Sequence, residues 1–235
     1  MGIGVAPGSK WLACKGCATA MCAQDALIGC GQFMVCPTDT TGTEKDCSQA
    51  PHLVSNSWGG GQGRDMFHEV IDAWTVAGII PVFANGNSGP SCGSANSPAD
   101  HADVIAVGST TSTDSLSSFS SVGPSVFGTI KPDVSAPGSS VNSAYNSHDS
   151  SYAVLSGTSM ACPHVAGVVA LLKGRNPDLT FQQVKQYLTQ GTFTDITETG
   201  RNCGGVEESS WPNNAFGYGR INALNSLLRL IAEEK

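Results

Sequence analysis

The chain has 235 residues with a formal net charge of −7; 40% of the residues are hydrophobic and only 13% are charged. This length is enough for one domain with a substantial core, and the hydrophobic content argues against a disordered chain. Because 12 basic residues stand against 19 acidic ones and no basic run occurs, we expect no nucleic acid partner.

Short apolar runs alternate with helical stretches in the first half of the chain. We predict strands at residues 10–14, 53–56 and 79–83, with helices at residues 23–35 and 64–77 between them. This alternation is typical of strands joined by crossover helices, and it therefore indicates a parallel sheet.

The second half continues the pattern and ends in helices. Together the elements predict an α/β fold with a mostly parallel sheet covered on both faces, in a single domain over residues 1–235. We predict strands at 104–107 and 133–136, surface strands and turns in the Ser-rich stretch 109–125, a long helix from 158 to about 174, and helices at 181–190 and 221–232.

The chain contains nine cysteines, seven of them from Cys14 to Cys92. The run Cys14-x2-Cys17-x4-Cys22 has no second Cys-x2-Cys and no histidine pair at finger spacing, so disulfides are favoured over a zinc or iron–sulfur site. The sequence leaves the pairing open. We expect Cys162 to be the unpaired cysteine, because it lies within a predicted helix of small residues.

Disulfides indicate an oxidising compartment, and we therefore expect a secreted protein. The first residues contain neither a basic region nor an apolar region typical of a signal peptide, and no run is long enough to span a membrane. We expect no membrane association, and we expect a signal sequence to lie upstream of Met1 in the gene product.

Residues 157–167, with the sequence Gly-Thr-Ser-Met-Ala-Cys-Pro-His-Val-Ala-Gly, are the most informative stretch. They place Ser159 at the start of the long predicted helix, where free N–H groups and the positive end of the helix dipole would face an oxyanion. Pro163 lies near the first turn, where a missing N–H costs little. Ser159 is thus a candidate nucleophile, and a helix N-cap is the structural alternative.

This stretch resembles the nucleophile motif of the subtilisin-like serine proteases. The resemblance covers nearly the whole chain and is least at residues 14–47 and in the last forty or so residues; the cysteine-rich early part looks most like secreted bacillopeptidase-type members. Four further blocks are similar to family blocks and come in the family's order: residues 4–8, 56–60, 84–90 and 131–138.

The resemblance implies peptide-bond hydrolysis through an acyl-enzyme, with a polypeptide as substrate. Ser159 would attack the scissile carbonyl, and the side-chain amide of Asn87 would stabilise the oxyanion beside the Ser159 backbone N–H. A turn residue is the structural alternative for Asn87. The resemblance adds no cofactor and no metal site to this reading.

The resemblance also implies a substrate-binding groove. Its first wall would be the segment Ser57-Trp58-Gly59, which pairs with the substrate backbone, although Trp58 could instead be a core aromatic residue. The second wall of the specificity pocket would be Ala84-Asn85-Gly86, where small residues leave room for a side chain.

The family's catalytic aspartate and histidine blocks precede the segment that residues 4–8 resemble, and the chain does not contain them. His164 lies five residues after Ser159, about 140° around the helix, and is expected to be structural. Loss of the histidine alone lowers kcat about 2 × 10⁶-fold in subtilisin. We therefore expect negligible hydrolysis by this chain alone, unless an N-terminal fragment supplies the aspartate and the histidine.

The resemblance further implies that the first two strands of the family's sheet are missing. The predicted strand at residues 10–14 would lose both neighbours, so we expect this segment to be mobile, repacked or paired with another chain. The chain is interpreted as a truncated peptidase domain, and an evolved pseudoprotease is the alternative.

Two other functions deserve comparison. The spacing Gly157-x-Ser159-x-Ala161 approximates the nucleophile elbow of α/β-hydrolases, but that fold requires a histidine downstream and none follows His164. A non-catalytic module that binds peptides or proteins in the same groove remains open as an alternative.

Overall fold

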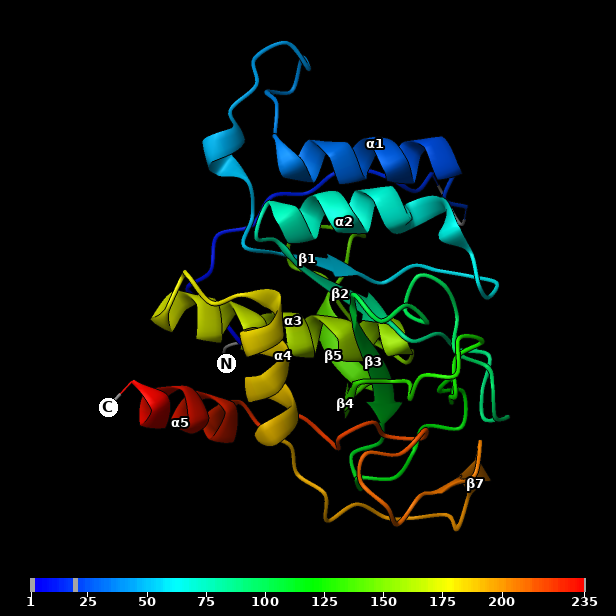
Figure 1. The fold of residues 1–235 in the computed structure, drawn as a ribbon. Coiled ribbons are helices and arrows are strands. Elements are labelled where there is room, and N and C mark those ends of the chain that lie inside the picture. Colours follow the sequence, from blue (N-terminus) through cyan, green and yellow to red (C-terminus); the bar gives the residue numbers. More distant parts are fainter. Residues whose placement is uncertain (1–2, 19–20, 235) are drawn as a thin grey trace.

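A computed structural model of the chain, which describes residues 3–18 and 21–234, contains a four-stranded parallel sheet between helices (Figure 1). The strands are β1 (Leu53–Asn56), β2 (Ile80–Ala84), β3 (Ile105–Thr110) and β4 (Val134–Pro137), in the order β1-β2-β3-β4. All three pairings are parallel, so the strand prediction for these segments is confirmed to within a few residues.

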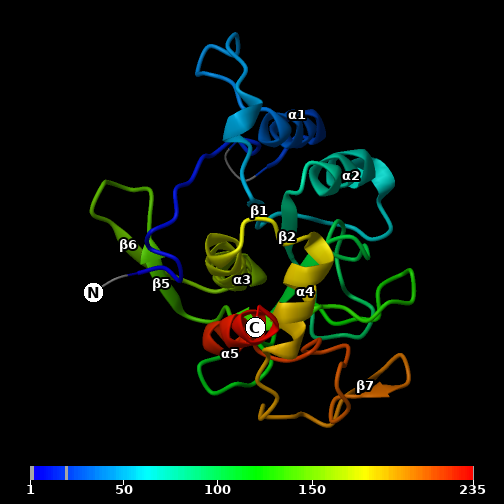
Figure 2. The ribbon, with the colours of Figure 1, turned by 60° about the vertical axis from the view of Figure 1, so that its left-hand side comes forward.

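Helices cover both faces of the sheet. On one face α3 (Thr158–Arg175) packs against all four strands, and α4 (Phe181–Gln190) and α5 (Ala223–Glu233) pack on α3 (Figure 2). On the other face lies α2 (His68–Val76), which follows a 3₁₀ turn, and α1 (Gln24–Val35) packs on α2. The three layers expected from the sequence are therefore present.

Each face of the sheet has its own core. In β2, Val82 belongs to the core under α3, whereas the next residue, Phe83, belongs to the core under α2. All five residues of β2 are buried, as expected for a central parallel strand that is covered on both sides. None of the helices that the structure describes is long and apolar enough to cross a membrane.

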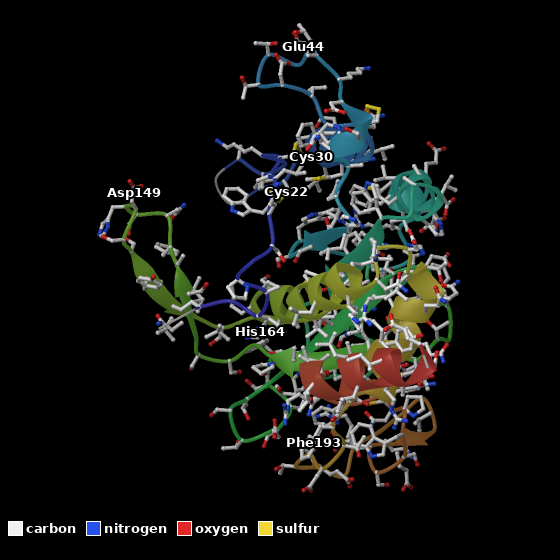
Figure 3. The ribbon with its side chains drawn as sticks, turned by 90° about the vertical axis from the view of Figure 1, so that its left-hand side faces the viewer. Cys22, Cys30, Glu44, Asp149, His164 and Phe193 are labelled. Carbon is white, nitrogen blue, oxygen red and sulfur yellow. A yellow bond between two sulfur atoms is a disulfide. The ribbon has the colours of Figure 1, made fainter. Side chains whose placement is uncertain are left out.

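The strand predicted at residues 10–14 is wrong. This segment is irregular, and no strand among the described residues pairs with it or with the side of β1 that faces away from β2. A strand needs a hydrogen-bonded neighbour, and disulfides instead attach this part of the chain to its surroundings: Cys14 is bonded to Cys30 in α1, and Cys17 to Cys22 (Figure 3). The segment is therefore repacked.

The remaining bridges join Cys36 to Cys47 and Cys92 to Cys203. Cys162 is free and buried, which confirms the prediction that it is the unpaired cysteine. The disulfide reading of the cysteine-rich segment is also confirmed.

Two hairpins were not predicted. One joins β5 (Val141–Ala144) and β6 (Tyr152–Leu155), and its tip near Asp149 projects from the body (Figure 3). The other is the short pair β7 (Asn202–Cys203) and β8 (Val206–Glu207). Neither hairpin alternates polar and apolar residues clearly, so no pattern in these segments predicts a strand.

The prediction of surface strands and turns for the Ser-rich stretch is right only in part: the turn residues Ser112, Thr113 and Ser118 are exposed, but several other serines are buried. Ser109, Ser117 and Ser120 are at most 1% exposed. The hydroxyls of Ser109 and Ser117 are 2.7 Å apart, and the Ser120 hydroxyl accepts a hydrogen bond from the Ser109 N–H. Serine can be buried here because its hydroxyl finds partners within the stretch.

A buried ion cluster lies where β4 begins. The Asp133 carboxylate is 2.8 Å from the Lys131 ammonium and 2.6 Å from the Lys185 ammonium, and it also accepts a hydrogen bond from the Ala106 N–H. Lys131 is only 1% exposed. The cluster connects β3, β4 and α4, and Asp133 is thus a structural carboxylate at a strand end.

Candidate active site

Ser159 is the second residue of α3, as the motif predicts, and its side chain is half-buried. Among the residues that the structure describes, its backbone N–H has no hydrogen-bond partner, which is expected in the first turn of a helix. The positive end of the helix dipole adds to the field at this point. Both features favour an anion next to Ser159.

Ser57 and Ser159 hold each other in place. The Ser57 hydroxyl donates to the Ser159 carbonyl at 2.9 Å, and the Ser159 hydroxyl donates to the Ser57 carbonyl at 3.3 Å. The Ser159 carbonyl is available because its helical partner four residues later is Pro163, which has no N–H. Pro163 is the sixth residue of α3 and lies beyond the first turn, so its missing N–H leaves the Ser159 carbonyl without a helical partner, contrary to the expectation that it costs little.

Asn87 is attached to the same helix end by its side-chain oxygen. The Asn87 Oδ1 atom accepts hydrogen bonds from the backbone N–H of Thr158 at 2.8 Å and from its hydroxyl at 2.9 Å. Two donors on the oxygen fix the orientation of the amide and leave its NH₂ group for another acceptor. Thr158 is a further site residue that the sequence analysis did not single out.

The amide NH₂ of Asn87 and the N–H of Ser159 border one small space. A Cβ atom placed on Gly157 would lie 3.6 Å from the Asn87 Nδ2 atom and 3.6 Å from the Ser159 backbone nitrogen. Because residue 157 is glycine, it places no side chain in this space, which the Met160 sulfur also borders at 3.6 Å. Two convergent donors beside a serine hydroxyl form the arrangement that binds the oxyanion of an acyl-transfer intermediate.

The predicted groove residues lie on the loop that follows β1, at the last residue of β2 and on the loop that follows β2. Ser57 and Gly59 are exposed, and a Cβ atom on Gly59 would lie 2.6 Å from the Ser97 carbonyl oxygen, so only glycine fits there. The half-buried Trp58 ring packs against Phe67 and Phe83, with centroid distances of 4.9 and 5.2 Å. The Trp58 ring is therefore part of the core under α2.

The three residues predicted for the second wall differ in exposure. The side chains of Ala84 and Asn85 are buried, and the Asn85 amide donates to the Ser121 carbonyl at 2.8 Å. Gly86 has a φ of 108°, and a Cβ atom there would lie 2.1 Å from the Asn96 side-chain oxygen. The conformation of this segment therefore depends on glycine.

No base contacts the candidate nucleophile within the described part of the chain, where the Ser57 carbonyl is the one partner of the Ser159 hydroxyl. The His164 ring instead bonds through Nδ1 to the Met160 carbonyl at 2.8 Å, in agreement with the structural role expected for it. The buried Cys162 is no substitute nucleophile, because burial raises the pKa of its thiol to about 11.

Comparison with known proteins identifies the family and several relatives of this chain. A family model described as the subtilase family matches residues 1–219. Bacillopeptidase F of Bacillus subtilis (strain 168) is 35% identical over 234 residues, which cover 96% of this chain and 15% of the relative. Serine protease AprX of the same organism is 36% identical over 188 residues, which cover 71% of this chain and 39% of the relative. Subtilisin Savinase of Lederbergia lenta is 31% identical over 221 residues, which cover 94% and 69%, respectively.

Solved structures agree with these relatives. Sphericase superposes with a TM-score of 0.68 and 25% sequence identity, covering 85% of this chain and 64% of the other. The prenylagaramide maturation protease PagA gives a TM-score of 0.67 at 22% identity, covering 91% and 70%. The subtilisin-like fold expected from the sequence is thus confirmed, and the chain spans well under half the length of the first two curated relatives.

Proposed function

The chain belongs to the subtilase family, and we propose that it is the nucleophile-bearing part of a serine endopeptidase. The observation that carries this proposal is the pair of donors around Gly157, where the Asn87 amide and the Ser159 N–H converge beside the Ser159 hydroxyl. In the proposed reaction Ser159 Oγ attacks a scissile peptide carbonyl, and the resulting oxyanion accepts hydrogen bonds from both donors.

The proton transfers require a histidine, and none of the residues that the structure describes places one at Ser159. We propose that a His–Asp pair from outside these residues removes the Ser159 hydroxyl proton and delivers it to the leaving amine as the C–N bond breaks. Water then attacks the acyl-enzyme, giving its proton to the same histidine, and the carboxylic acid product leaves as Ser159 regains its proton.

We further propose that the segment supplying this His–Asp pair docks beside β1. The side of β1 away from β2 pairs with no strand among the described residues, and a cavity of about 310 Å³ adjoins it, lined in part by Cys14, Met34, Val54 and Trp58. An upstream strand could add to this edge through main-chain hydrogen bonds. The disulfides support a secreted location for the assembled protein.

The test compares the 235-residue chain with a longer polypeptide that includes the upstream gene sequence, and with the chain mixed with that upstream fragment. Each is measured on a series of chromogenic peptides, with a Ser159→Ala variant as the matched control. We expect turnover only when the upstream sequence is present, and loss of that turnover in Ser159→Ala. Turnover by the short chain alone that Ser159→Ala abolishes would contradict the proposed origin of the base.

A non-catalytic peptide-binding module is the second candidate. It is favoured by the Ser159 hydroxyl having a carbonyl, and not a base, as its partner in the described residues. A serine-directed phosphonofluoridate separates the two candidates. Labelling of Ser159 in the longer polypeptide indicates an activated nucleophile, whereas peptide binding without labelling indicates a binding module.

A further inference from the structure

Two histidines and an aspartate meet outside the candidate active site, where the start of α2 and the 3₁₀ turn before it lie against the segment before β3. One ligand atom of each of Asp65, His68 and His101 lies within 4.8 Å of those of the other two. The His68 Nε2 and His101 Nδ1 atoms are 2.8 Å apart, and the two rings meet at 86°. Asp65 is exposed, His68 is half-buried and His101 is 4% exposed.

The hydrogen bond on the far side of the His101 ring fixes its tautomer. The His101 Nε2 atom lies 3.0 Å from the Arg64 carbonyl oxygen, which can only accept, so Nε2 carries the proton and Nδ1 presents a lone pair toward His68. A histidine that ligates a metal typically donates its other N–H to a backbone carbonyl or a carboxylate in this way.

A buried carboxylate lies behind His101 as well. Asp100 is fully buried, and its Oδ2 atom accepts hydrogen bonds from the Gly63 N–H and the Ser97 hydroxyl. Its Oδ1 atom has no hydrogen-bond partner and lies 3.7 Å from His101 Nε2. A cation bound on the other side of the ring would interact favourably with this buried carboxylate, whose Oδ1 atom lacks a hydrogen bond.

We propose that Asp65, His68 and His101 bind a divalent first-row transition ion of the Zn²⁺ class, with water in the remaining position. Two imidazoles and one carboxylate are a donor set that suits Zn²⁺ and not Ca²⁺ or Mg²⁺, which prefer oxygen ligands. Metal binding would replace the hydrogen bond from His68 Nε2 to His101 Nδ1, so His68 must carry its proton on Nδ1 instead, leaving a lone pair on Nε2. Tetrahedral Zn²⁺ separates two nitrogen ligands by about 3.3 Å, so the two nitrogen atoms must also move apart by about half an ångström and turn their lone pairs toward the ion. The half-buried position of His68 permits this movement.

The ion would clamp two segments that already share hydrogen bonds. The Gly60 N–H donates to the Ser97 carbonyl at 2.9 Å, and the Arg64 N–H donates to the Ser97 hydroxyl at 3.0 Å. The loop held in this way directly follows Ser57, Trp58 and Gly59, the proposed substrate-pairing segment. The inferred role of the metal is therefore to fix this wall of the groove, and not to take part in bond cleavage.

The test is a metal titration of the purified 235-residue chain after treatment with a chelator. We expect calorimetry to show one Zn²⁺ per chain, Co²⁺ to give a visible absorption band typical of a low-symmetry nitrogen and oxygen site, and the unfolding temperature to rise with Zn²⁺. Ca²⁺ in large excess should not displace the Co²⁺. Absence of stoichiometric Zn²⁺ binding, or displacement by Ca²⁺, would refute the proposal.

Variants locate the site. His68→Gln and Asp65→Asn change side chains that are not fully buried, and each should weaken Zn²⁺ binding at least tenfold while leaving the metal-free unfolding midpoint nearly unchanged. The matched control is His52→Gln, an exposed histidine elsewhere, which should bind as the parent does. Equal Zn²⁺ affinity in the parent and in His68→Gln would overturn the assignment. Because these readouts do not use peptidase activity, they separate this proposal from the proposed function.

Discussion

Replacing Asp133 with asparagine should destabilise the chain strongly, although the two side chains are nearly the same size. In the parent, the Asp133 carboxylate lies 2.8 Å from the ammonium of Lys131, which is 1% exposed. Asp133→Asn leaves this ammonium buried without a counter-ion. Removal of one partner from a buried pair costs about 3–5 kcal/mol of unfolding free energy. Lys185 contributes less to this cost, because its side chain is 27% exposed and water can solvate it.

The matched control is Asp114→Asn, which breaks the ion pair between Asp114 and Arg220. Their side chains are 31% and 26% exposed, and such a pair contributes at most about 1 kcal/mol. Urea unfolding followed by tryptophan fluorescence, with the disulfides intact, gives both values. If Asp133→Asn costs no more than Asp114→Asn, the argument from burial is refuted.

The same cluster makes the free energy of unfolding depend on pH. Burial acts to raise the pKa of Asp133, but the ammonium groups of Lys131 and Lys185 outweigh it and hold the pKa below its usual value of 3.8. The pKa of Asp133 is lower in the folded chain than in the unfolded chain. The stabilisation that the Asp133 carboxylate contributes is therefore complete above about pH 4, and it is lost as the pH falls through the pKa of the folded chain. The difference in unfolding free energy between the parent and Asp133→Asn should therefore become smaller at acidic pH.

Three further predictions concern the site and its surroundings. Thr158→Val removes one of the two donors that orient the Asn87 amide. In the longer polypeptide it should lower kcat about tenfold with little change in KM, as measured by steady-state kinetics. An unchanged kcat would show that the Thr158 backbone N–H alone is enough to orient the amide. Ser57→Ala removes the donor to the carbonyl that lacks its helical partner, and should cost about 0.5–1.5 kcal/mol in urea unfolding, whereas the exposed control Ser118→Ala should cost almost nothing. Replacing Cys92 and Cys203 by alanine opens a cross-link over 111 residues and should cost roughly 2–5 kcal/mol, so an unchanged unfolding midpoint would contradict the pairing.

The elements that the sequence predicted well are those whose signal is local. The strand at residues 53–56 and the helix at residues 181–190 agree with the structure in both bounds, because an apolar run and a Thr180–Gln183 capping box mark them. The segment at residues 10–14 has the same apolar character, yet it is not a strand. Its state depends on whether a neighbouring strand is present, which is information that the segment itself does not contain.

In the candidate site, too, local sequence motifs predicted the residues but not the contacts between them. Ser159 and Asn87 were identifiable from their neighbours in the sequence, and the structure brings them to the same helix end through Thr158. The contacts that position them join residues 71 and 102 positions apart, as in the pairs of Thr158 with Asn87 and Ser57 with Ser159. Such contacts arise from the parallel sheet, whose strand ends meet at one edge, and they were not readable from local pattern.

All nine cysteines lie in the described residues, and Cys162 alone keeps a thiol. Its sulfur lies between α3 and the sheet, 3.7 Å from the carbonyl oxygens of Asn56 in β1 and Val82 in β2. A thiol reagent can reach it only when α3 lifts from these strands, so the modification rate measures how often that layer opens. Cys162 is thus a natural probe of local opening, three residues after the candidate nucleophile.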